Sequence, residues 1–91
     1  MPLSHSRLIS FVSTAQPARA LSFYRDVLGL ALIEESAFAL VFDAPGTMLR
    51  VTIVEHIAPA PYTVLGWAVG DIAQTVAALR ARGVTFRRLR A

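Results

Sequence analysis

A helix that ends at a glycine and lies between two strands occurs twice in this sequence, and this repeat constrains the fold most. Residues 17–28 place apolar side chains at helical spacing on one face, and Gly29 follows where a C-cap glycine is expected. Residues 72–82 have the same pattern, and Gly83 follows them. The flanking strands are expected at residues 7–12, 30–33, 62–69 and 84–89. The sequence therefore predicts an internal repeat of a strand–helix–strand unit.

Two more strands are expected after the first unit, at residues 38–43 and 48–55, joined by a turn of the Pro-Gly type. Residues 6–55 then form a complete βαβββ module. Residues 56–61 contain two prolines and no periodicity, which is typical of a linker, and residues 62–91 supply only βαβ of a second module. We expect an α+β fold, with the whole chain forming a single incomplete domain.

Composition excludes several classes of protein. The chain has 91 residues, of which 55% are hydrophobic and 16% are charged, so it is not intrinsically disordered. It has no cysteine, which excludes disulfides, thiolate metal sites and a cysteine nucleophile. No apolar run approaches the roughly 20 residues that a membrane span needs, and the N-terminus lacks the layout of a secretory signal. These observations predict a cytoplasmic protein without membrane contact.

The formal net charge of +3 comes from the C-terminal end. All nine basic residues are arginine, as is typical of a GC-rich bacterial genome, and five of them lie beyond residue 79. This end has Phe86 as its one aromatic residue, and the chain has no helix-turn-helix or zinc pattern. We interpret the arginines as a solvated surface and expect no nucleic-acid partner.

Three segments resemble the vicinal oxygen chelate superfamily, which includes glyoxalase I, bleomycin-resistance and fosfomycin-resistance proteins and extradiol dioxygenases. Residues 19–30 (RALSFYRDVLGL) resemble the signature of its first helix. Residues 65–72 and 76–84 resemble the start of its second module and the helix and turn that follow. The resemblance implies two βαβββ modules whose curved sheets enclose a cavity. It also implies that the last two strands, with the final metal-binding glutamate, are missing from this chain.

The metal-ligand positions that this resemblance implies hold unsuitable residues. They fall at or near Arg7, at Arg50 and at Val64, and the fourth lies beyond the chain end. Arginine keeps its proton in proteins and offers no lone pair, and valine has no donor atom. We therefore expect neither a metal nor another cofactor. A shifted alignment of the first strand leaves His5 as an alternative ligand.

Arg50 is the strongest candidate for ligand binding. Alternation along its strand places it with Thr52 on the face opposite Leu49, Val51 and Ile53, which should pack under the helices. A guanidinium in a cavity binds a carboxylate or phosphate through two parallel hydrogen bonds.

Arg7 and Tyr62 are expected to line the same cavity, with Tyr62 as an aromatic wall. The alternative is that Arg50 pairs with Glu34, Asp43 or Glu55 and only closes the cavity mouth.

Three functional hypotheses follow. The first is metal-independent binding of a small, anionic molecule between curved sheets. The second is a metal-dependent lyase or dioxygenase whose last strands are missing here, and the third is a non-catalytic dimerisation module. An incomplete second module leaves a sheet edge open near residues 84–89, so we also expect a homodimer or a domain-swapped pair.

Overall fold

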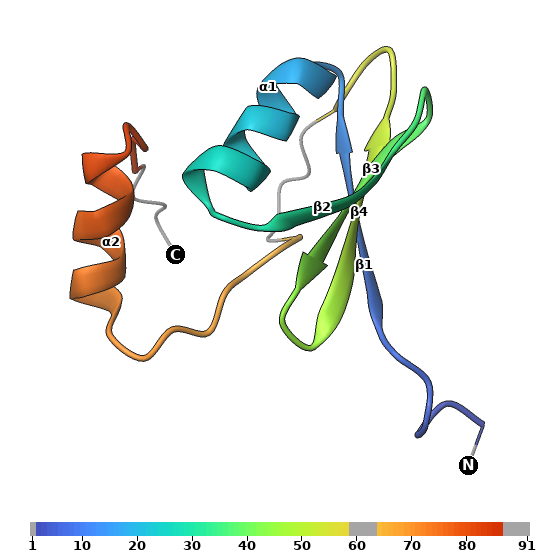
Figure 1. Cartoon of the computed structure of the whole chain (residues 1–91), viewed down its shortest axis with the longest axis horizontal. Coiled ribbons are helices and arrows are strands. Elements are labelled where there is room, and N and C mark those ends of the chain that lie inside the picture. The colour runs from blue at the N-terminus through green and yellow to red at the C-terminus, as the bar shows by residue number, and fades with distance from the viewer. Residues whose placement is uncertain (1, 59–63, 87–91) are drawn as a thin grey trace.

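The computed structural model describes residues 2–58 and 64–86, which form a four-stranded mixed sheet with helices on one side (Figure 1). In chain order, the elements are β1 (Ile9–Thr14), α1 (Pro17–Leu21), η1 (Ser22–Val27), β2 (Ala31–Glu35), β3 (Ala39–Ala44), β4 (Thr47–Ile53) and α2 (Ile72–Ala81). The order of strands in the sheet is β1-β4-β3-β2, with β1 parallel to β4 and the other pairs antiparallel. The predicted α+β class and the βαβββ order of the first module are confirmed.

The core lies between the sheet and α1–η1. Phe42 faces Leu49 across the β3–β4 ladder, and Leu40 faces Val51. All four side chains are at most 1% exposed. Tyr24 of η1 packs over them, with its ring 5.5 Å from that of Phe42. The predicted packing face of β4 is thus confirmed, because its alternate residues lie under the helices.

The first helix differs from the single α-helix expected at residues 17–28. Its second half, η1, is a π-helix, and the Leu28 N–H donates to the carbonyl of Phe23, five residues back, at 2.9 Å. Apolar spacing alone does not distinguish the two hydrogen-bond patterns, because Tyr24 and Leu28 pack against the core in either case. The helix ends at Gly29, whose φ of +78° is costly for any residue with a Cβ.

The second module is present only as its helix in the part of the chain that the structure describes. Helix α2 begins at Asp71, whose Oδ1 accepts from the Gln74 N–H at 3.0 Å, as an N-cap does. The strands predicted at residues 62–69 and 84–89 are not formed at residues 64–69 and 84–86, and the remaining positions lie outside the described residues. A strand needs a neighbouring strand for its backbone hydrogen bonds, and these segments have none among the described strands.

Two large apolar residues of the second module are exposed. Trp67 is 49% exposed and Ile72 is 68% exposed.

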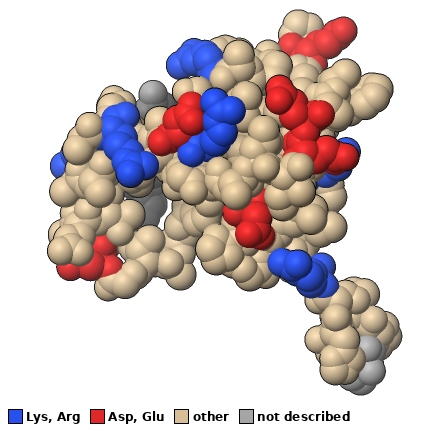
Figure 2. All heavy atoms as spheres, viewed as in Figure 1, with Lys and Arg blue, Asp and Glu red and all other residues tan. Residues whose placement is uncertain are grey.

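Charges of both signs are interspersed on the face of the molecule in Figure 2, so no continuous basic surface forms there. No helix of the described residues has the length and hydropathy to cross a membrane.

Candidate functional site

The candidate site lies on the face of the sheet that α1 and η1 leave uncovered. Arg50 occupies its centre, in β4, flanked by Phe11 of β1 on one side and by Val41 of β3 on the other. Phe11 is 62% exposed, whereas Arg50 is half-buried and Val41 is buried. Arg50 thus lies between two apolar cross-strand neighbours in the sheet.

Arg50 forms no salt bridge with an acidic side chain within the described part of the chain. The salt bridge found there joins Arg25 to Asp26, with 2.9 Å between Nε and Oδ1. The predicted alternative, in which Glu34, Asp43 or Glu55 pairs with Arg50, is therefore not observed among these residues. Asp43 does lie on the same face, but it is the cross-strand neighbour of Met48.

Thr52 lies one pleat from Arg50 on the same face, as predicted. Its neighbours across the two ladders are Ser13 of β1 and Ala39 of β3. The half-buried Thr52 and the exposed Ser13 place two hydroxyl groups at this end of the face.

The other two predicted site residues are Arg7 and Tyr62. Arg7 is exposed and precedes β1, which begins at Ile9 and not at residue 7 as predicted. Tyr62 lies outside the described residues. Among the described residues, Phe11 is an aromatic cross-strand neighbour of Arg50. Alternation in the first strand could have placed Phe11 on this face, but the pairing with Arg50 depends on the β1–β4 register.

The residues at the implied metal positions do not fit a metal ion. Arg7 and Arg50 carry no lone pair for coordination, and Val64, 63% exposed, lies outside any described strand. His5 is exposed in a turn before β1. Within residues 2–58 and 64–86, no three or more His, Cys, Asp or Glu side chains are grouped so that they could hold a metal.

Comparison with known proteins agrees with this architecture. A sequence profile described as Glyoxalase/Bleomycin resistance protein/Dioxygenase superfamily matches residues 7–90. The chain belongs to this superfamily. No curated protein sequence gives a significant match to it.

Two solved structures share the superfamily fold with this chain. A lactoylglutathione lyase from Agrobacterium tumefaciens is 19% identical with a TM-score of 0.65, and the alignment covers 91% of this chain and 74% of the lyase. A glyoxalase family protein from Enterococcus faecalis is 20% identical with a TM-score of 0.68, and the alignment covers 99% of this chain and 81% of that protein. At these identities the likeness establishes the fold alone.

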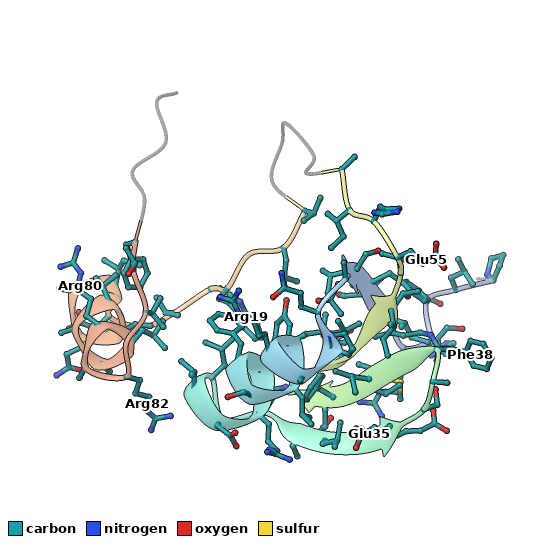
Figure 3. The ribbon with its side chains drawn as sticks, turned by 90° about the horizontal axis from the view of Figure 1, so that it is seen from above. Arg19, Glu35, Phe38, Glu55, Arg80 and Arg82 are labelled. Atoms are coloured by element: carbon teal, nitrogen blue, oxygen red, sulfur yellow. The ribbon has the colours of Figure 1, made fainter. Side chains whose placement is uncertain are left out.

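A hollow lies beside the start of α1, on the helical side of the sheet. Its volume is about 580 Å³, and Gln16, Arg19, Glu55 and His56 contribute its polar lining. Arg19 donates from Nη1 to Gln16 Oε1 at 3.0 Å, and Figure 3 shows Arg19 on α1 and Glu55 after β4. All four polar residues are exposed. This superfamily member therefore has a broad, open depression there, lined by exposed polar side chains.

Proposed function

We propose that this protein binds a small anionic molecule on the open face of its sheet, without a metal, and that Arg50 anchors the anion. The observation that carries the proposal is the half-buried Arg50, which has no acidic partner among the described residues. A partly buried, unpaired charge is costly, so a site of this kind is stabilised by an anion.

The neighbours of Arg50 favour a particular class of ligand. A carboxylate or phosphate can accept two parallel hydrogen bonds from the guanidinium. Phe11 offers a flat apolar surface beside it, and Thr52 offers a hydroxyl one pleat away. A planar or partly apolar acid would use all three groups.

The proposal is tested by screening small carboxylates and phosphates for thermal stabilisation and measuring the affinity of each hit by calorimetry. Arg50→Ala should weaken binding about ten- to a hundredfold, because a charge-assisted hydrogen bond contributes roughly 1.5–3 kcal/mol. Arg25→Ala is the matched control, since Arg25 pairs with Asp26 on an exposed surface.

Equal affinity in wild type and Arg50→Ala for every hit would refute the proposal. Metal analysis of the same protein samples separates it from metal-dependent lyase or dioxygenase activity. One equivalent of bound metal required for ligand affinity would favour that alternative.

We also propose that the protein is a cytoplasmic homodimer in which a second copy covers the open face. Ile9 and Phe11, 44% and 62% exposed, place apolar surface beside Arg50. Exposed apolar surface of this kind favours association. Coverage by a second copy would turn the open face into the wall of a cavity.

A further inference from the structure

A small apolar cavity separates α2 from the first module, on the opposite side of the sheet from Arg50. Its volume is about 190 Å³. Three pairs of residues line it: Leu28 and Leu30 from the end of η1 and the start of β2, Trp67 and Val69 from the segment before α2, and Thr75 and Leu79 from α2.

The two sides of the cavity are held together by a polar contact and not by close packing. Arg82, at the C-terminal end of α2, donates from Nη1 to the carbonyl of Val27 at 2.9 Å. Figure 3 shows Arg82 extending from α2 toward η1. No residue of α2 is buried, and Leu79 is only partly covered. The helix is thus positioned beside the first module while space remains between them.

The lining offers few polar groups. The Thr75 hydroxyl already donates to the carbonyl of Asp71 at 2.9 Å, and the other polar side-chain group is the indole N–H of Trp67. The cavity is partly open, since Trp67 and Val69 are 49% and 38% exposed, but so apolar a lining offers water few hydrogen bonds and favours an apolar occupant. A cavity of about 190 Å³ with this lining suits an uncharged molecule of about one aromatic ring.

We propose that this cavity, the Trp67 pocket, binds a small uncharged aromatic molecule of one ring. Trp67 forms its wall and is 49% exposed, so a second ring can pack against the indole in an offset or edge-to-face arrangement. The ligand bridges Leu30 of the first module and Leu79 of α2, and therefore stabilises the docking of α2. The site is separate from Arg50 and requires no anion.

Ethylbenzene is the probe, and the emission of Trp67 is the readout, because Trp67 is the only tryptophan of the chain. The full chain should show a saturable shift of this emission to shorter wavelength with one ethylbenzene bound per chain. An emission change that rises without saturation would contradict the proposal.

Thr75→Phe should fill the cavity from the α2 side without altering the core of the first module, and weaken ethylbenzene binding by at least about tenfold. Gln74→Phe is the matched control, because Gln74 is the exposed neighbour on the same helix and does not line the cavity. Circular dichroism checks that both variants keep α2. Unchanged affinity in Thr75→Phe would overturn the proposal.

A different occupant of the cavity would give a different result. If a second copy fills the cavity, Trp67 emission depends on protein concentration and ethylbenzene has no saturable effect. Arg50→Ala should leave ethylbenzene affinity unchanged, which separates this site from the proposed anion site.

Discussion

Arg50 differs in its surroundings from four other arginines of the chain. Arg25 pairs with Asp26, Arg19 bonds Gln16, and Arg82 bonds backbone carbonyls. Arg80 lies over the ring of Phe86, 5.5 Å from its centroid. Arg50 has no comparable contact among the described residues, and its cross-strand neighbours are Phe11 and Val41. These neighbours make it the arginine best placed to bind an external anion.

Replacing Arg50 with lysine tests whether geometry or charge alone holds the anion. Arg50→Lys keeps the charge but loses the planar pair of donors, so it should lose most of the affinity that Arg50→Ala loses. Calorimetry with a carboxylate hit measures this directly. Wild-type affinity in Arg50→Lys would mean that a point charge suffices and that the bidentate contact is absent.

Tyr24 makes stability depend on pH in the alkaline range. Burial raises the pKa of its hydroxyl above the ordinary value of 10.0. The unfolded chain therefore loses this proton first, and the free energy of unfolding should fall as the pH rises above about 10. Urea denaturation of wild type and Tyr24→Phe across this range measures the effect. The decline should be shallower in Tyr24→Phe, and an identical slope would show that Tyr24 does not contribute.

At the scale of elements, α2 depends on Arg82 for its position. The guanidinium bonds the carbonyls of Val27 and Asp26 at the end of η1, at 2.9 and 3.5 Å. Cations are stabilising at helix C-termini. Arg82→Ala should speed amide hydrogen exchange in α2 and leave exchange in β3 and β4 unchanged. Arg80→Ala, on the same helix, is the control. Equal protection of α2 in both variants would mean that apolar contacts position the helix.

The elements of the first module could be predicted because each has a recognisable local sequence pattern. The alternation of Leu49, Arg50 and Val51 indicates a strand with one buried face, and Gly29 indicates the end of the first helix. The second module could not be predicted in this way. A strand such as that expected at 64–69 forms only beside a partner strand, and no local pattern shows whether that partner exists.

The candidate site could be predicted only where a local sequence pattern determines it. The faces of Arg50 and Thr52 follow from period-two alternation. The contact between Arg50 and Phe11 joins residues far apart in the chain, and it depends on the parallel register of β1 and β4. The first strand begins at Ile9 and not at residue 7, so Arg7 has no partner in the β1–β4 ladder.

At the scale of the whole molecule, the apolar surface beside Arg50 predicts association. Sedimentation at micromolar concentration should give twice the mass of one 9.9 kDa chain. Phe11→Ser should shift the equilibrium toward the monomer, because it removes the most exposed ring beside Arg50. Phe38→Ser is the control, since Phe38 is 76% exposed at the end of the β2–β3 hairpin, away from this face (Figure 3). A monomer at all concentrations would contradict the dimer.

The central claim is that an anion binds at Arg50 on the open sheet face. Heteronuclear NMR of the ¹⁵N-labelled protein tests it most directly, by following backbone amides and arginine Nε–H groups during titration with a carboxylate hit. We predict saturable shifts at Arg50, Phe11 and Thr52, and none at Arg19 or His56. Shifts concentrated at Arg19 and His56, with Arg50 unchanged, would contradict the account.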